Sequence, residues 1–418
     1  MSRSRGPASS LAALLLGAAV ALAAGPALAA GPDQQVGRRH VIDPAGLPSP
    51  NATSSVSNSA AVVDPPGGAS LRVPAGFRVN VFRDHLYGPR WMAVAPNGDV
   101  ILTETNSDHV RVLRDADGDG VAEQAGIYTK EITLPHGLAL ADGALYVSSP
   151  TQVYRFAYRP GDIKPRGAPE PVLPEGSLGD GGGHFTRDLA LSPDGREMFI
   201  AVGSGSNLAE EAPPRATVQR WNFADRRLAT FASGLRNPVG IAFYPGSDDL
   251  YVTVNERDGL GEELAPDYLT RIREGEFYGW PYAYAGTHPD PGFGRRRPDL
   301  VQRSRMPDLL IRAHSAPLGL VFYDGGQFPA RYRGGAFIAL HGSWNAARPR
   351  GYMVAFVPFR DGRPADFYES FAIGFWLSGD NPAQVMGRPA GLAVAKDGSL
   401  LVADDSGGRI WRISYPGR

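Results

Sequence analysis

The stretch PRWMAVAPNGDVILT, residues 89–103, sets a pattern that recurs along the chain. Pro and Arg open it, an apolar segment follows, and a Pro-Asn-Gly turn leads into a second apolar segment. Two short apolar segments joined by such a turn are typical of a β-hairpin. Further copies begin at residues 135, 186, 238, 317 and 389.

The starts of these repeats lie 46, 51, 52, 79 and 72 residues apart. Such spacing is close to one four-stranded propeller blade per copy, with two insertions in the later half. We therefore predict an all-β fold, a six-bladed β-propeller that forms a single domain over residues 69–418. An elongated solenoid of independent hairpins is the alternative, but the long insertions suit the loop face of a propeller better.

An N-terminal strand is expected to close the last blade, as is usual in propellers. Residues 77–82, FRVNVF, alternate apolar and polar side chains as a strand does, and they are expected beside residues 409–413, RIWRI. The 52 Gly and 37 Pro indicate many turns between short strands, in agreement with this fold.

The N-terminus carries the features of a secretory signal. Arg3 and Arg5 precede an apolar run over residues 11–24, and Ala27-Leu-Ala29 gives a small-x-small cleavage pattern. We predict a signal peptide over residues 1–29 and a periplasmic or secreted protein; a retained membrane helix is disfavoured by the short run. Residues 30–68 have few large apolar side chains and are expected to form a flexible leader.

Composition narrows the classes of partner. The formal net charge of −1 argues against nucleic acid or an anionic membrane as the main partner. The chain has no Cys, so neither disulfides nor a Cys-containing zinc site is expected.

The residues just before each repeat's first strand are expected to form one ring around one mouth of the central channel. A single Arg or His there is ordinary, but cationic and imidazole side chains gather at matched positions, as would suit a small polyanionic ligand. An imidazole in such a ring could act as a general base. The ring consists of Arg90, His136, His184 with Arg187, Arg236 with Asn237, His314 and Arg388.

Two loops are candidate sites for a hard cation. Asp115, Asp117 and Asp119 precede Gly120 at the spacing of a Ca²⁺ loop, but Gly126 stands where an EF-hand has Glu, so an ordinary Asp-Gly turn remains the alternative. The second loop, residues 255–263, is Gly-rich and follows a predicted strand, so its carbonyls could face a cation.

One group of motifs carries a family resemblance. They are SGLRNPVGIAF (233–243), YVTVNE (251–256), PDYL (266–269) and GWP (279–281). With them the chain resembles, over about residues 70–415, the soluble sugar dehydrogenases that depend on pyrroloquinoline quinone (PQQ). The segment ALHGSWN (339–345) stands where glucose-oxidising members carry a Lys and is closer to the sorbosone and pyranose branch.

The resemblance implies a role for each matched residue. Arg236 and His184 would be catalytic, with His184 as the general base. Asp258, Gly259 and Leu260 would offer carbonyls to a Ca²⁺ ion on the cofactor. The residues implied to bind the cofactor are Arg90, His136, Arg187, Asn237, His341, Trp344 and Arg388.

The resemblance also implies the activity: a small sugar or sugar aldehyde would pass hydride to PQQ, and electrons would leave to an acceptor that the sequence does not identify. Two rival functions stay open. One is a non-catalytic propeller that binds a glycan or peptide, and the other is a metal-dependent lactonase, whose chemistry needs carboxylate and Asn ligands at the axis.

Overall fold

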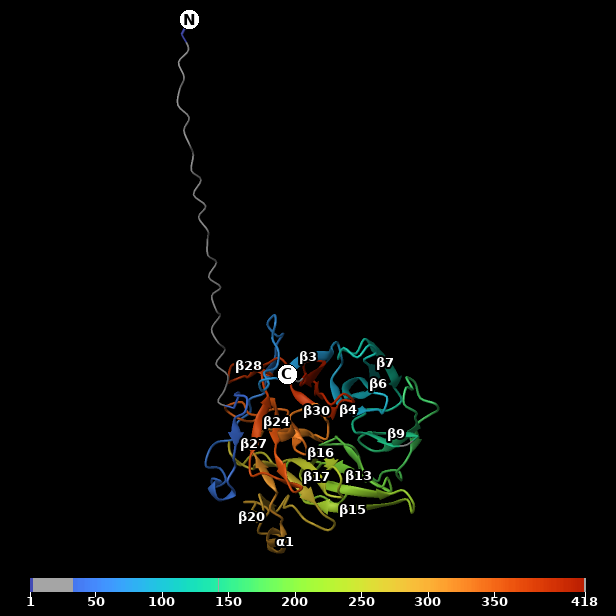
Figure 1. The fold of residues 1–418 in the computed structure, drawn as a ribbon. Helices are drawn as coiled ribbons and strands as arrows, with labels where there is room; N and C mark the ends of the chain where they lie inside the picture. Colours follow the sequence, from blue (N-terminus) through green and yellow to red (C-terminus); the bar gives the residue numbers. More distant parts are fainter. Residues whose placement is uncertain (3–32, 142, 417–418) are drawn as a thin grey trace.

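The computed structural model describes residues 1–2, 33–141 and 143–416, and the described chain is built from many short sheets (Figure 1). The predicted signal peptide lies almost wholly outside these residues. Only one short α-helix, α1 (Pro298–Arg303), occurs in the described parts. The all-β class is therefore confirmed.

Among the described residues, six sheets have four or five strands, and each begins with the hairpin of one repeat. The first three contain β4 (Pro89–Val94), β5 (Val100–Glu104), β6 (His109–Arg114) and β7 (Gln124–Thr129); β8 (Leu138–Ala141), β9 (Ala144–Ser148), β10 (Val153–Ala157) and β11 (Glu170–Pro171); β12 (Leu189–Leu191), β13 (Glu197–Val202), β14 (Thr217–Asn222) and β15 (Arg227–Ser233). The other three contain β16 (Asn237–Phe243), β17 (Leu250–Asn255), β18 (Asp267–Ile272) and β21 (Leu309–Ile311); β22 (Pro317–Phe322), β23 (Ala336–Leu340), β24 (Met353–Val357), β27 (Tyr368–Ala372) and β1 (Arg39–His40); β30 (Pro389–Val394), β31 (Leu400–Asp404), β32 (Arg409–Ser414) and β3 (Arg78–Arg83).

Smaller elements fill the connections. They are the strands β2 (Ala61–Val62), β19 (Ala283–Tyr284), β20 (His288–Pro289), β25 (Phe359–Arg360), β26 (Arg363–Pro364), β28 (Trp376–Ser378) and β29 (Gln384–Val385), and the 3-10 helices Pro44–Gly46, Thr105–Ser107 and Ala330–Tyr332.

The first strands β4, β16 and β30 lie near the centre of the molecule, whereas strands such as β7 and β15 lie toward its periphery (Figure 1). The first strands of the six sheets contact one another in the order β4, β8, β12, β16, β22, β30 and β4 again. Gly240 and Gly391 permit the close approach, because a Cβ there would collide with the main-chain carbonyl of Leu318 or Arg90 on the next first strand. The apolar side chains of neighbouring sheets pack between them; Leu392 and Val402, for example, meet Phe337 in one cluster.

The N-terminal strand β3 pairs antiparallel with β32, as expected from the two segments. Val79 lies opposite Ile413, so β3 forms the outer edge of the sheet that contains the last repeat. This pairing joins in one sheet two segments from opposite ends of residues 70–415, the region that carries the family resemblance.

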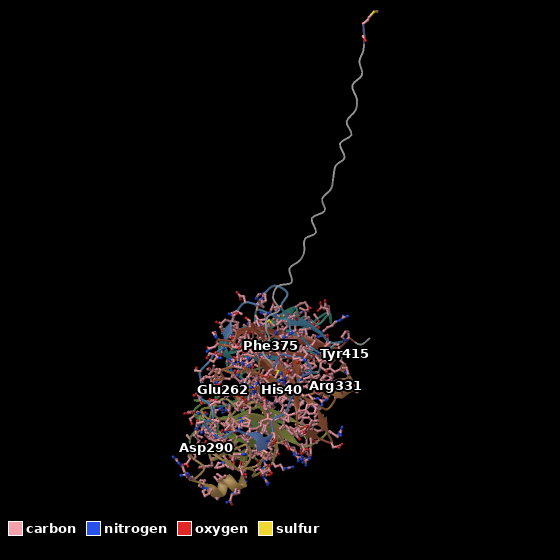
Figure 2. All side chains as sticks on the ribbon, turned by 90° about the vertical axis from the view of Figure 1, so that its left-hand side faces the viewer. His40, Glu262, Asp290, Arg331, Phe375 and Tyr415 are labelled. Carbon is pink, nitrogen blue, oxygen red and sulfur yellow. The ribbon has the colours of Figure 1, made fainter. Side chains whose placement is uncertain are left out.

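Residues 33–62, which we name the strap, differ from the expected flexible leader. β1 pairs with β27 as a fifth strand, with Arg39 opposite Glu369, and β2 pairs with β29 in parallel. His40 stacks on Tyr368 at a centroid distance of 4.7 Å and lies among the side chains of the main body (Figure 2). The described part of the leader is therefore ordered along the sheets.

The strap also binds two loops. The N–H of Asn51 donates to the Leu260 carbonyl at 2.7 Å, and Asn58 Nδ2 donates to the Ala346 carbonyl at 2.9 Å. The prediction of flexibility was wrong for residues 33–62 because it counted apolar burial alone. Hydrogen bonds to a sheet edge and to exposed loops, which composition does not reveal, offset the cost of ordering here.

Within the described residues, no helix has the length and apolar character needed to cross a membrane.

Candidate active site

A cavity of about 500 Å³, the first cavity, lies where the first strands of several sheets begin. Its volume is within the range of small-molecule sites. The ring residue His314 also lines it. The predicted site residues that line it are Arg90, His184, Arg236, Asn237, Asp258, His341, Trp344 and Arg388.

His184 is held as a neutral imidazole with one nitrogen free to accept a proton. Its Nδ1 lies 3.0 Å from both the carbonyl and the hydroxyl oxygen of Ser204. The Ser204 hydroxyl donates its own proton to the Ser206 carbonyl at 2.6 Å, so it can only accept from Nδ1. The ring proton therefore lies on Nδ1. Burial, with the nearby Arg236 charge, lowers the pKa of His184 to about 4.

Two predicted cofactor contacts lie beneath the cavity instead of lining it. Arg187 is fully buried, and its Nη1 donates to the carbonyls of His184 and Thr186, both at 2.8 Å. It therefore supports the turn that carries His184. His136 is also fully buried and lies 4.4 Å from Trp91 between ring centroids, and burial holds its pKa well below the ordinary value.

Arg236 is fixed by main-chain carbonyls and one carboxylate. It donates to the carbonyls of Asn207 at 3.2 Å and Glu256 at 2.7 Å, and its Nη2 lies 3.2 Å from Asp258 Oδ2. Most of its partners are neutral, so its positive charge is only partly compensated beside the cavity.

The wall that carries His314 is acidic. His314 Nε2 donates to the Gly261 carbonyl at 2.9 Å, and Asn345 Nδ2 donates to Asp258 Oδ1 at 2.6 Å. Burial works against the charged imidazole, but Asp258 and the Gly261 carbonyl outweigh it and raise the pKa of His314. Asp267 accepts main-chain N–H groups on both oxygens, and burial raises its pKa to about 7.

A third group of residues, around Asp405, completes the cavity. Asp405 pairs with Arg90, and His341 Nε2 lies 3.0 Å from each Asp405 oxygen. Although burial opposes it, His341 and Arg90 lower the pKa of Asp405, whereas burial lowers the pKa of His341 to about 4. Arg388 donates to the carbonyls of His341 at 3.1 Å and Gly342 at 2.6 Å, so neutral acceptors hold it.

Two carbonyls of the loop predicted to face Ca²⁺ already accept hydrogen bonds. The Asp258 carbonyl accepts from Arg257 Nε at 3.0 Å and from Asn207 Nδ2 at 3.2 Å. The Leu260 carbonyl accepts from Asn51 of the strap. Neither Gly259 nor Leu260 lines the first cavity. The Ca²⁺ ligands of this loop were predicted without knowledge of the strap, which hydrogen-bonds to the loop at Leu260.

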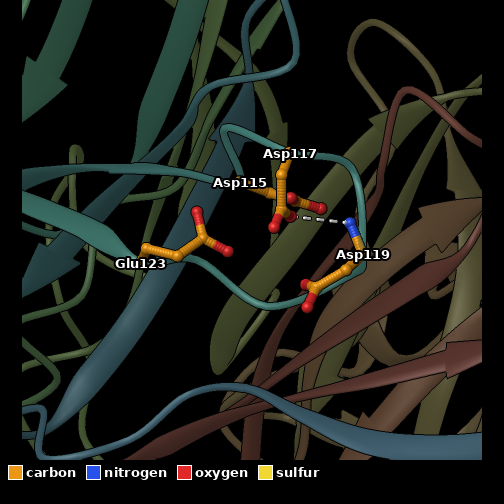
Figure 3. Close-up of side chains that lie close together, drawn as sticks. All are labelled: Asp115, Asp117, Asp119 and Glu123. Carbon is orange, nitrogen blue, oxygen red and sulfur yellow. Dashed lines mark hydrogen bonds between the residues drawn. The ribbon is translucent and has the colours of Figure 1, made fainter.

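The other predicted cation loop lies between β6 and β7, away from the first cavity. Asp115, Asp117 and Asp119 gather with Glu123, and one ligand oxygen from each lies within 4.8 Å of the others (Figure 3). Several of these oxygens accept main-chain N–H groups of the loop, for example Asp117 from Asp119 at 3.1 Å. The four carboxylates are at the surface.

Sequence reasoning missed several residues that line the first cavity. Asn207, Glu256, Asp267 and Asn345 belong to it, and Asn207 ties Arg236 to Asp258 by accepting from both on its side-chain oxygen. Asp267 and Asn345 stood in quoted motifs without a role; Asp267 is the first residue of β18, and Asn345 lies in the loop after β23. Asn207 had no signal, because it lies in an irregular loop.

Comparisons with known proteins bear on this site. The TrAA12-like family profile matches residues 71–286 and 300–416. An uncharacterized protein of Borreliella burgdorferi is 29% identical over 363 residues, which cover 83% of this chain and 91% of that protein. A pyrroloquinoline quinone-dependent pyranose dehydrogenase of Coprinopsis cinerea is 24% identical, and the match covers 82% of this chain but only 54% of that longer protein.

The fold has a solved counterpart. The PQQ domain of the Coprinopsis cinerea pyranose dehydrogenase, in its holo form, superposes with a TM-score of 0.70. The match covers 85% of this chain and 100% of that domain, at 18% sequence identity. At that identity the likeness supports the fold alone.

Proposed function

This chain belongs to the TrAA12-like family, and from that premise we propose that it is an oxidoreductase that binds PQQ in the first cavity and oxidises a sugar there. One observation carries the proposal: guanidiniums at the start of the first strands β4, β16 and β30 line a single cavity together with a neutral imidazole. The six sheets, in their cyclic order, would be the six blades of a propeller that β3 closes.

The residues present fit an anionic planar cofactor. Arg388 is held by neutral carbonyls, so its charge remains available to a carboxylate. Asn237 Oδ1 is buried and has no partner among the described residues, so a ligand donor could satisfy it. Arg90 and Arg388 would hold cofactor carboxylates, Arg236 and Asn237 the quinone oxygens, and Trp344 and His341 would lie beside the ring.

When bound, PQQ would supply an acceptor for one hydride, which carries the two electrons of the oxidation. The chain's own residues then have defined tasks. His184 takes the hydroxyl proton of the substrate on Nε2, since Nδ1 already carries its proton. Arg236 faces the developing negative charge with a geometry fixed in advance by the carbonyls of Asn207 and Glu256. Ser204 keeps the His184 ring in the required tautomer.

The substrate class that we propose is a small aldose or sugar aldehyde of the sorbosone and pyranose group, oxidised in the periplasm or outside the cell. Electrons would pass to an acceptor of unidentified chemistry. For calcium we propose the acidic loop of Asp115, Asp117, Asp119 and Glu123, because four carboxylates gather there, whereas the carbonyls of Asp258 and Leu260 already accept hydrogen bonds. An ordinary Asp-rich turn is the competing interpretation of that loop.

The lactonase alternative is weakened by the residues that line the first cavity. Arg90, Arg236 and Arg388 line the first cavity together with His184, and so many cationic and imidazole groups suit an anionic ligand better than a metal ion held by carboxylate and Asn ligands. Only a measurement of activity distinguishes the proposed enzyme from the alternative, a non-catalytic protein that binds a glycan or peptide.

The test is to titrate the apoprotein with PQQ, with and without Ca²⁺, and to follow the cofactor absorbance together with dye reduction by a panel of aldoses and sorbosone. We expect a saturable absorbance change and dye reduction by at least one sugar. Absence of both would overturn the oxidoreductase proposal, whereas sugar binding without dye reduction would favour the non-catalytic alternative.

A further inference from the structure

A second cavity, of about 520 Å³, lies on the other side of the loop 205–211 from the first. Gly205, Ser206 and Asn207 of this loop line the first cavity, whereas Glu210 and Glu211 line the second. The loop is therefore a shared wall. The two cavities have no lining residue in common, so the second needs an explanation of its own.

Aromatic side chains form one side of the second cavity. Phe277 and Tyr282 are half-buried, and their ring centroids lie 6.4 Å apart at an interplanar angle of 42°. Phe277 packs directly on Gly234, where a Cβ would collide with the ring, so its position is fixed from behind. Trp280 is buried and donates its Nε1 proton to the Asn207 carbonyl at 3.1 Å. These rings offer an apolar surface, and the indole N–H of Trp280 is already hydrogen-bonded.

Polar groups of both charges form the other side. Glu211 accepts from the Gly205 N–H at 2.7 Å and from the Ser206 hydroxyl at 2.8 Å, which fixes the carboxylate and leaves further lone pairs on it. Glu210 is half-exposed beside the Tyr282 hydroxyl, and burial together with Glu210 raises the pKa of Tyr282. Arg215, whose Nη1 lies 3.5 Å from the Gly203 carbonyl, also lines the cavity.

Of the four charged side chains that line this cavity, two already have a partner of opposite charge: Arg215 pairs with Asp180, and Arg296 Nη1 lies 3.8 Å from Glu210 Oε1. A strongly ionic ligand would gain little there. A ligand with an apolar face and several hydroxyl groups would use every feature, because C–H groups pack on aromatic rings while hydroxyls donate to carboxylates and accept from guanidinium. A pyranose ring has this combination.

We propose that the second cavity is a carbohydrate-binding site that takes a neutral pyranose unit, packed against Tyr282 and Phe277 and hydrogen-bonded by Glu210 and Glu211. The site does not depend on PQQ. Hydrogen bonds connect its wall to the first cavity. Glu211 accepts from the Ser206 hydroxyl, and the Ser206 carbonyl accepts from the hydroxyl of Ser204. The same Ser204 hydroxyl accepts from His184 Nδ1 and so orients that ring. A sugar bound here would therefore lie one loop away from the proposed reaction.

The test uses the full-length apoprotein and a methyl glycoside, such as methyl β-glucopyranoside, whose anomeric oxygen is blocked against oxidation. Binding is measured by calorimetry or ligand-observed NMR. We expect millimolar binding that Tyr282→Ala weakens roughly tenfold, which corresponds to about 1.4 kcal/mol. Glu210→Gln, at an exposed position that folding tolerates, is expected to weaken it by about fivefold.

Tyr87→Ala is the matched control, because Tyr87 is 71% exposed and lines neither cavity. It should bind the glycoside as the wild type does. Wild-type affinity in both Tyr282→Ala and Glu210→Gln, or no binding of methyl glycosides by the wild type, would overturn the proposal. Dye reduction measured in parallel separates the two sites: glycoside binding without dye reduction would leave this site standing while the redox proposal fails.

Discussion

Two imidazoles in the lining of the first cavity, on parts of it that we call the His184 wall and the His314 wall, have opposite character. On one wall His184 lies near Arg236, and burial lowers its pKa to about 4. On the other wall His314 lies beside Asp258, and its pKa is raised. Both rings are mostly buried, so the difference arises from the charge placed next to each. A neutral ring can accept a proton, whereas a ring biased toward its cation can hold negative charge.

The largest expected effect is a loss of activity when His184, which belongs to only one of the two walls, is replaced. His184→Ala should lower kcat by about 10²–10⁴-fold, the range for loss of a general base, with little change in PQQ affinity. Steady-state dye reduction and a PQQ titration measure the two quantities. His85→Ala, at an exposed imidazole, is the control. A variant that keeps wild-type kcat would remove His184 from the proposed chemistry.

The pH dependence sharpens the same contrast. The base works as the neutral ring, and a lowered pKa keeps it neutral until the pH falls to about 4. We therefore expect kcat/KM to hold through pH 5 and then to decline about tenfold per unit below the pKa. A reversible acid limb close to the ordinary imidazole value, near 6.5, would show that the ring is not desolvated as described.

Substitution of Asp258 should act mainly on the His314 wall. Asp258→Asn removes the carboxylate that raises the pKa of His314, so that pKa should fall. NMR titration of the histidine ring protons measures it, and Asp248→Asn, at an exposed carboxylate, is the control. An unchanged His314 titration would mean that Asp258 does not set the character of this wall.

The strap should matter to the His314 wall and much less to the His184 wall. Asn58 Nδ2 donates to the carbonyls of Ala346, Ala347 and Asp380, next to the loop that carries Trp344 and Asn345. Asn58→Ala should cost about 1–3 kcal/mol by leaving buried carbonyls unpaired. Thermal unfolding and the His314 titration report the two effects. Ser59→Ala, at the exposed neighbour, should match the wild type, and equal loss in both variants would contradict the assignment.

The smallest effect is expected far from both walls. Asp117→Asn should leave sugar oxidation unchanged and abolish any rise in Tm that Ca²⁺ gives the wild type, because the acidic loop lies outside the first cavity. Scanning calorimetry with Ca²⁺ or a chelator measures it. If Ca²⁺ shifts the Tm of both proteins equally, the loop is an ordinary turn.

The sequence was enough to predict the all-β class and the hairpin with which each of the six sheets begins. Repeats such as PRWMAVAPNG carry apolar alternation and turn residues, which act over a few neighbouring positions and can be read locally. The same regularity placed His184, Arg236 and Arg388 at equivalent positions and so predicted that they meet.

The tertiary structure alone decided which of these equivalent residues reach the cavity. His136 and His184 both lie close to the start of the first strand of successive repeats, yet His136 is buried against Trp91 and His184 lines the cavity. It also decided that the strap binds the loop at Leu260 and that Asn207 joins the site. The physical reason is that burial and hydrogen bonding depend on segments far apart in the chain, whereas periodicity and turn chemistry depend only on near neighbours.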